Sequence, residues 1–161
     1  MNHLSRILSL LLLVSAAVFF SNCDGGDDPQ KTEEEIQLEK FEAGQWTIQT
    51  VTNDGVNRTT EYPGMTLSFT GTFATGGTYQ YSSNATSWPA MSPWEKSGTW
   101  KFVSGSVGSK IIRLTDDVEM TYAFTNSDKQ LSLTFNYTGG GFDNGRVEKV
   151  EGAWSFIFTR P

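Results

Sequence analysis

Residues 44–51, which read Gly-Gln-Trp-Thr-Ile-Gln-Thr-Val, decide the fold class of the chain. In a β-strand, successive side chains alternate between the two faces, so Trp46, Ile48 and Thr50 would share one face. Residues 154–160, Trp-Ser-Phe-Ile-Phe-Thr-Arg, repeat this alternation at the other end of the chain. Pairing of the last strand with the first would leave no exposed sheet edge, so the two segments predict a closed barrel.

Further segments between these two show the same alternation. They are residues 65–70, 78–82, 98–103, 110–114, 119–125 and 130–137. Gly, Asn, Asp and Ser separate them, and residues 115–118 and 126–129 are typical of tight hairpins. Together with the two terminal strands they predict an all-β fold, an eight-stranded antiparallel up-and-down barrel with a short N-terminal helix.

The helix is predicted just before the first strand. Thr32, followed three residues later by Glu35, is a capping box, and the helix should run to about Glu42. We expect Ile36 and Phe41 to anchor this helix across one end of the barrel.

An apolar run of 14 residues, 7–20, follows a short segment that carries Arg6. This pattern is typical of an export signal, and the run is short for a membrane span. The single cysteine, Cys23, stands just after the run, where a bacterial lipoprotein carries its lipid. We therefore expect lipid attachment at Cys23. The alternative is a secreted protein that is cut near Ala17 and keeps a free thiol.

These features divide the chain into a signal peptide (residues 1–22), a flexible acidic tether (23–31) and a barrel domain (32–161). Most of the negative charge lies near the tether, because residues 36–161 carry 12 acidic and 10 basic side chains, a net charge of −2. The barrel domain shows no basic patch and no run of Lys or Arg. We expect no nucleic-acid partner, and contact with the membrane only through the lipid anchor.

The residue types for most catalytic and metal sites are missing from the barrel domain. The only histidine is His3, and the only cysteine is the presumed lipid anchor. This composition excludes catalytic triads and zinc sites built on those side chains. Asp116, Asp117 and Glu119 could bind calcium weakly or act as an acid/base pair, but a solvated hairpin is the simpler interpretation. We expect a protein that is not an enzyme and has no metal or cofactor.

Several short motifs resemble those of lipocalins. Gly44-Gln45-Trp46 after a short helix is similar to the G-x-W motif that opens lipocalin barrels, where an arginine after the last strand packs over the tryptophan. Arg160 stands in the matching place, so the resemblance implies that Trp46 and Arg160 close the barrel. The second lipocalin motif, Thr-Asp-Tyr before a late strand, is missing.

Residues 76–79 and 97–102 are similar to stretches in lipocalin-like lipoproteins of Bacteroidota, many of unknown function. The resemblance covers about residues 40–161 and implies a lipocalin-like barrel. The acids that follow Cys23 resemble the signal that sends such lipoproteins to the outer face of the outer membrane. This implies a lipid-anchored protein that is exposed on the surface of a Gram-negative bacterium.

One loop is unusually apolar. Residues 87–94 read Ser-Trp-Pro-Ala-Met-Ser-Pro-Trp, and Trp88, Met91 and Trp94 could stack on a sugar ring or cover a lipid at the barrel mouth. The alternative is that both tryptophans fold inward and plug the barrel. The strand faces that we assign inward carry three Trp and six Phe, so a filled barrel, or a shallow site at its rim, is favoured over a deep cavity.

Three functions remain possible from the sequence. The first is a non-catalytic lipoprotein that binds a small hydrophobic or carbohydrate ligand at the barrel rim. The second is a protein-interaction module, an enzyme inhibitor or a subunit of a surface complex, that has a filled barrel and no small ligand. The third, an esterase or glycosidase that uses carboxylates alone, has the least support.

Overall fold

The structure is a computed structural model, and it describes residues 30–84, 92–142 and 150–161. The compact unit that concerns us begins at Thr32 and ends at Pro161. Its elements are α2 (Glu33–Glu42), β1 (Trp46–Asn53), β2 (Val56–Asn57), the 3-10 helix η1 (Thr59–Glu61), β3 (Thr66–Thr70), β4 (Tyr79–Ser83), β5 (Ser97–Phe102), β6 (Lys110–Arg113), β7 (Val118–Thr125), β8 (Gln130–Tyr137) and β9 (Gly152–Thr159).

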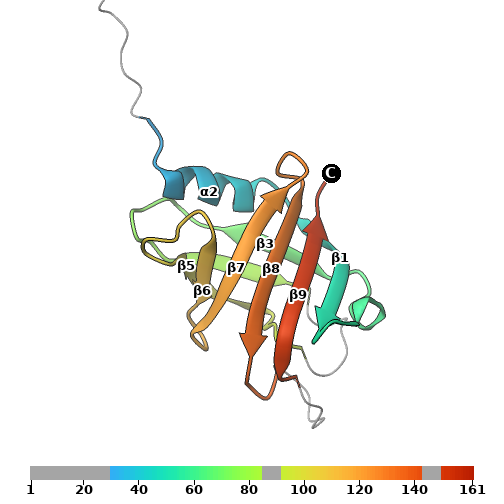
Figure 1. The fold of residues 1–161 in the computed structure, drawn as a ribbon. Coiled ribbons are helices and arrows are strands. Elements are labelled where there is room, and N and C mark those ends of the chain that lie inside the picture. The colour runs from blue at the N-terminus through green and yellow to red at the C-terminus, as the bar shows by residue number, and fades with distance from the viewer. Residues whose placement is uncertain (1–29, 85–91, 143–149) are drawn as a thin grey trace, which may run out of the picture. The chain divides into compact units, whose positions relative to one another are not determined.

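The strands form a closed antiparallel barrel (Figure 1). Around the barrel the order is β1-β3-β4-β5-β6-β7-β8-β9, and β9 pairs with β1 from Thr47↔Thr159 to Asn53↔Trp154. This confirms the predicted eight-stranded barrel. All eight predicted strands are present, with ends that differ from the prediction by at most two residues.

The structure adds one strand that the sequence analysis missed. The two-residue strand β2 pairs with the end of β1 through Thr52↔Asn57 and Asn53↔Val56. Asp54 (φ 48°) and Gly55 (φ 77°) form the turn, in the left-handed region that an Asp-Gly hairpin requires. Strand β2 is too short to show an alternating pattern.

A β-bulge in β1 changes which side chains face the barrel interior, so the predicted assignment of the two faces of this strand is wrong after Ile48. The pairing of β1 with β9 shifts register between Ile48 and Thr50, so one extra residue lies on the β1 side. After the bulge, Val51 points into the core and is fully buried, whereas strict alternation from Trp46 would place it outside.

Helix α2 begins as predicted, because the Thr32 hydroxyl accepts a hydrogen bond of 3.2 Å from the backbone N–H of Glu35. Phe41 is buried as predicted, but the expectation for Ile36 is wrong, since 40% of that residue is exposed. Five residues correspond to a rotation of about 140° on a helix, so Ile36 and Phe41 lie on different faces. Leu38, three residues before Phe41, supplies the second anchor.

Aromatic side chains fill much of the barrel interior. Among the described residues, the rings that we assigned inward are at most 6% exposed, except that Phe124 is half-buried. The buried ones are Trp46, Phe69, Trp100, Phe102, Phe135, Trp154, Phe156 and Phe158. Within the described ranges, no helix has the length and apolar character needed to cross a bilayer.

Candidate functional site

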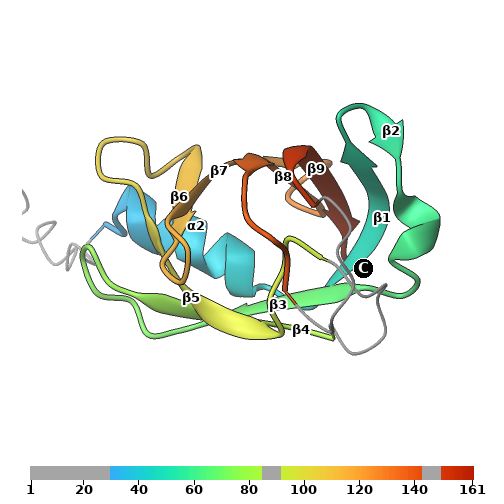
Figure 2. The same ribbon diagram turned by 90° about the horizontal axis from the view of Figure 1, so that it is seen from below.

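One end of the barrel is covered by α2, and we call it the helix end. Figure 2 shows α2 between β3 and β5 on one side and β6 and β7 on the other. The Phe41 ring enters the barrel here and is fully buried. Its centroid lies 4.8–6.0 Å from the centroids of five other rings, which belong to Phe69, Trp100, Phe102, Tyr122 and Phe124. Phe41 therefore closes this end of the interior.

The first turn of α2 is fixed to the barrel through Glu34. Its carboxylate accepts hydrogen bonds from the backbone N–H of Gly76 at 3.0 Å and from the hydroxyl of Tyr79 at 3.1 Å. Burial and this carboxylate together raise the pKa of Tyr79 to about 12. At the other end of the helix, the Phe41 carbonyl accepts a 2.9 Å bond from the Trp46 indole. Both ends of α2 are thus attached to strands of the barrel.

The opposite end is closed by residues 92–94, and we call it the Trp94 end. Trp94 is only 2% exposed and makes edge-on contacts with Tyr81, Phe135 and Phe156 at 5.5–6.0 Å. This is the inward plug that we considered as the alternative for Trp94, so its ring is not an exposed rim contact. Trp88 and Met91, the other two candidate ligand residues, lie outside the described part of the chain.

A buried arginine, Arg113, lies at the Trp94 end and was not among the site residues predicted from the sequence. Arg113 occupies an inward position of β6 and is 1% exposed. Its guanidinium donates Nε–H to Asp116 Oδ1 at 2.8 Å, Nη2–H to Asp116 Oδ2 at 2.6 Å and Nη1–H to the Pro93 carbonyl at 2.6 Å. Four aromatic rings surround the guanidinium at 5.3–6.0 Å, those of Trp94, Phe135, Tyr137 and Phe142.

Two polar atoms beside this arginine are buried, the Tyr81 hydroxyl oxygen and the Trp94 indole nitrogen, and the indole nitrogen has no hydrogen-bond partner among the described residues. Burial raises the pKa of Tyr81, while the positive charge of Arg113 acts in the opposite direction. Buried polar atoms that lack a protein partner commonly bind a water molecule. The cluster therefore has the features of a polar plug inside an aromatic core.

The Trp46–Arg160 contact predicted from the lipocalin resemblance is present. The Arg160 guanidinium carbon lies 4.9 Å from the Trp46 ring centroid, and Arg160 Nε donates to the Asp128 carbonyl at 2.9 Å. Trp46 is fully buried in this arrangement. The pair thus ties the end of β9 to the start of β1, where the barrel closes.

The acidic turn does not assemble a metal site. No group of three or more His, Cys, Asp or Glu side chains suited to a metal ion is found among residues 30–84, 92–142 and 150–161. Asp116 binds Arg113, and Glu119 forms an ion pair with Lys110 at 2.5 Å. The expectation of a simple solvated hairpin therefore holds for Asp117, which is exposed, but not for Asp116.

A groove of about 470 Å³ lies beside the first turn of α2, and we call it the rim groove. It is bounded by residues of α2, of the connection between β3 and β4, and of β5 with the connection that follows. Its apolar side chains are Phe102, Val103, Val107 and Ile112. Its charged side chains are Glu34, Lys101 and Glu119. The volume is in the range of small-molecule sites, which are mostly apolar with a few polar groups.

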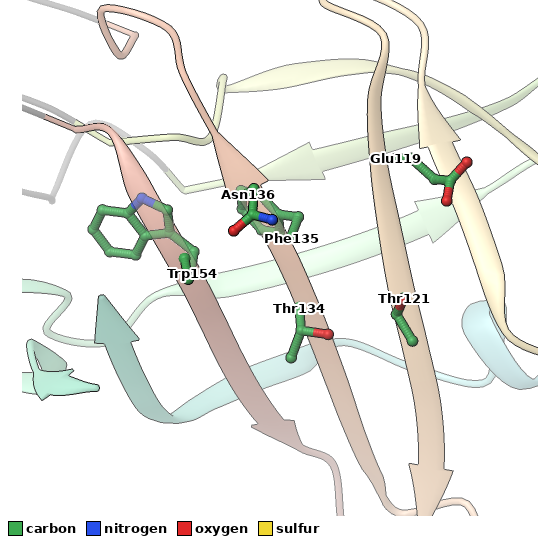
Figure 3. A pocket seen from close by; sticks show the side chains of 7 residues that line it. Glu119, Thr121, Thr134, Phe135, Asn136 and Trp154 are labelled. Atoms are coloured by element: carbon green, nitrogen blue, oxygen red, sulfur yellow. The ribbon is translucent and has the colours of Figure 1, made fainter. Parts of the chain in front are cut away.

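A second hollow, of about 340 Å³, lies on the outer face of β7, β8 and β9 (Figure 3). Its lining combines the hydroxyl and amide groups of Thr121, Thr134 and Asn136 with the apolar residues Phe135, Ala153 and Trp154. Glu119 lines this hollow and the rim groove, so the two adjoin each other. The rim groove offers more apolar surface and is the better candidate for a small ligand.

Comparison of the chain with known protein families, with curated proteins and with solved structures found no match.

Proposed function

We propose that this protein is a non-catalytic lipoprotein, anchored in the outer membrane through Cys23, whose barrel binds a small, largely hydrophobic ligand at its rim. The observation that carries the proposal is the contrast between a filled interior and an open groove. Phe41 and Trp94 occupy the two ends of the interior, whereas the rim groove has a volume of about 470 Å³ and four apolar side chains in its lining. Small ligands bind preferentially in such partly apolar clefts.

Binding in the groove can be measured with anilinonaphthalene sulfonate, whose fluorescence rises when it binds apolar surface. Val107→Asp places a charge in the lining of the groove and should strongly reduce the fluorescence. Val56→Asp is a matched control, because Val56 is 58% exposed on β2 and does not line the groove. If Val107→Asp and Val56→Asp leave the same signal as the unaltered protein, the ligand site is not in this groove.

The membrane anchor is supported by the apolar run before Cys23 and the polar, acidic segment after it. One acyl chain alone gives marginal membrane binding, so we expect the two or more chains of a bacterial lipoprotein. Labelled fatty acid should enter the protein, and the label should disappear in Cys23→Ala. Equal labelling of both proteins would contradict lipid attachment at Cys23.

The same filled interior also favours a second function, that of a protein-interaction module. A barrel whose core is packed with rings is a rigid scaffold, and its loops and outer face could contact an external enzyme or a surface complex. This alternative predicts that no small molecule binds the groove. The fluorescence titration with Val107→Asp therefore separates the two functions.

A further inference from the structure

The charges around the rim groove indicate which class of ligand it accepts. Glu34 is already engaged by the Gly76 N–H and the Tyr79 hydroxyl, and Glu119 is paired with Lys110. Lys101 is exposed and forms no ion pair with any residue in the described part of the chain. The groove therefore has one positive charge, that of Lys101, which is not paired with a carboxylate of the described residues.

The position of Lys101 places this charge next to the apolar part of the groove. Lys101 precedes Phe102 and Val103 directly in the chain, and its Cα partner on β6 is Ile112. Phe102 is nearly buried, whereas Val103 and Ile112 are half-buried. An apolar body in the groove could thus contact these side chains while an anionic group reaches the ammonium group of Lys101. The site combines one cationic contact with an apolar lining.

We infer that the rim groove binds a small amphipathic carboxylate, with its apolar body against Phe102, Val103 and Val107 and its carboxylate paired with Lys101. This inference rests on the proposed function and adds the ligand class to it. Glu34 and Glu119 also line the groove, so we expect a ligand with two negative charges to be repelled more strongly than a ligand with one. A neutral apolar molecule would leave Lys101 without a partner. Binding involves no covalent step and needs no other molecule.

Phenylbutyrate and its neutral amide, phenylbutyramide, make a matched pair of probes, because they share the apolar body and differ in charge. Their dissociation constants can be measured by titration of the purified Cys23→Ala protein, in which no acyl chain competes for the groove. The carboxylate should bind about two- to fivefold more tightly than the amide, which is the range for an exposed ion pair. The preference should shrink as salt concentration rises.

The preference should vanish in Lys101→Gln, which removes the charge but keeps a long polar side chain. Lys96→Gln is the matched control, because Lys96 is an exposed lysine that does not line the groove. If both probes bind equally well, and Val107→Asp weakens both, the ligand class is wrong although the groove is a binding site. If neither probe binds, or if Val107→Asp has no effect on binding, the proposed function itself fails and the inference falls with it.

Discussion

Asp116 and Arg113 form a two-point ion pair inside the barrel wall, with N–O distances of 2.8 and 2.6 Å. The arginine is 1% exposed and the side chain of Asp116 is 21% exposed. A charge this deeply buried is costly unless it is paired, so removal of one partner destabilises a protein more than the pair itself stabilises it. The same guanidinium holds the Pro93 carbonyl, which links the pair to the segment that closes the Trp94 end.

The first prediction concerns this pair. Asp116→Asn should lower the free energy of unfolding by about 3 kcal/mol, the lower end of the range for a broken buried pair, because Asp116 retains some exposure. Asp117→Asn is the matched control, since Asp117 is exposed, and asparagine tolerates its φ of 55°. Urea denaturation of the two variants measures the difference. Equal stabilities would contradict the role given to Asp116.

The second prediction concerns the ring that closes the helix end. Phe41→Ala should cost about 3–5 kcal/mol of stability, because it leaves a cavity among five rings. Ile36→Ala on the same helix should change stability by about 0.5 kcal/mol or less, since Ile36 is largely exposed. Thermal unfolding followed by circular dichroism would measure both. A small effect of Phe41→Ala would mean that α2 contributes little to the closure of the barrel.

A third prediction concerns Arg160 over Trp46. Arg160→Ala should lower the free energy of unfolding by about 0.5–2 kcal/mol, because it removes a cation–π contact and one hydrogen bond. Probe binding in the rim groove should stay nearly unchanged, since neither residue lines the groove. The opposite result, normal melting with lost binding, would refute a structural role for the pair.

A fourth prediction follows from the tyrosines, because burial raises the pKa of all five. They are Tyr62, Tyr79, Tyr81, Tyr122 and Tyr137. A pKa that is higher in the folded state gives stability that is complete below the ordinary value of about 10 and is lost as the pH rises through the folded value. For Tyr79 this window is from pH 10 to about 12.

The native protein should therefore show little tyrosinate absorbance at pH 10, and the signal should appear together with alkaline unfolding. Tyr79→Phe should weaken the pH dependence of stability within the window from pH 10 to about 12. Free titration of several tyrosines near pH 10 with the fold intact would contradict the burial described for them.

Most of the barrel could be predicted from the sequence because alternation depends on local pattern alone. The start of α2 could also be predicted from neighbouring residues alone, because the Thr32 hydroxyl accepts a hydrogen bond from the residue three positions later. The bulge between Ile48 and Thr50 has no such local signal, and it reverses which face Val51 occupies. The β1–β2 turn did have one, the Asp54-Gly55 dipeptide, which the sequence analysis did not use.

The two sites were harder to predict because their parts are distant in the sequence. An inward position of β6 carries Arg113, but only the tertiary structure brings Trp94, Phe135 and Tyr137 around it. Asp116 lies in a turn of the kind that is usually solvated, so its partner could not be inferred from composition. The rim groove depends on how α2 and two connections meet, and the spacing of Val103 and Val107 alone does not reveal it.

The claim that a ligand binds at the rim groove, outside a filled barrel, can be tested most directly by mapping amide chemical shifts during a titration with anilinonaphthalene sulfonate. The account predicts that the largest shifts fall on Gly76, Lys101, Val103 and Val107, with small shifts at Trp94, Phe135 and Phe156. Largest shifts at Trp94, Phe135 and Phe156, with Val103 and Val107 unaffected, would place the ligand inside the barrel and contradict the account.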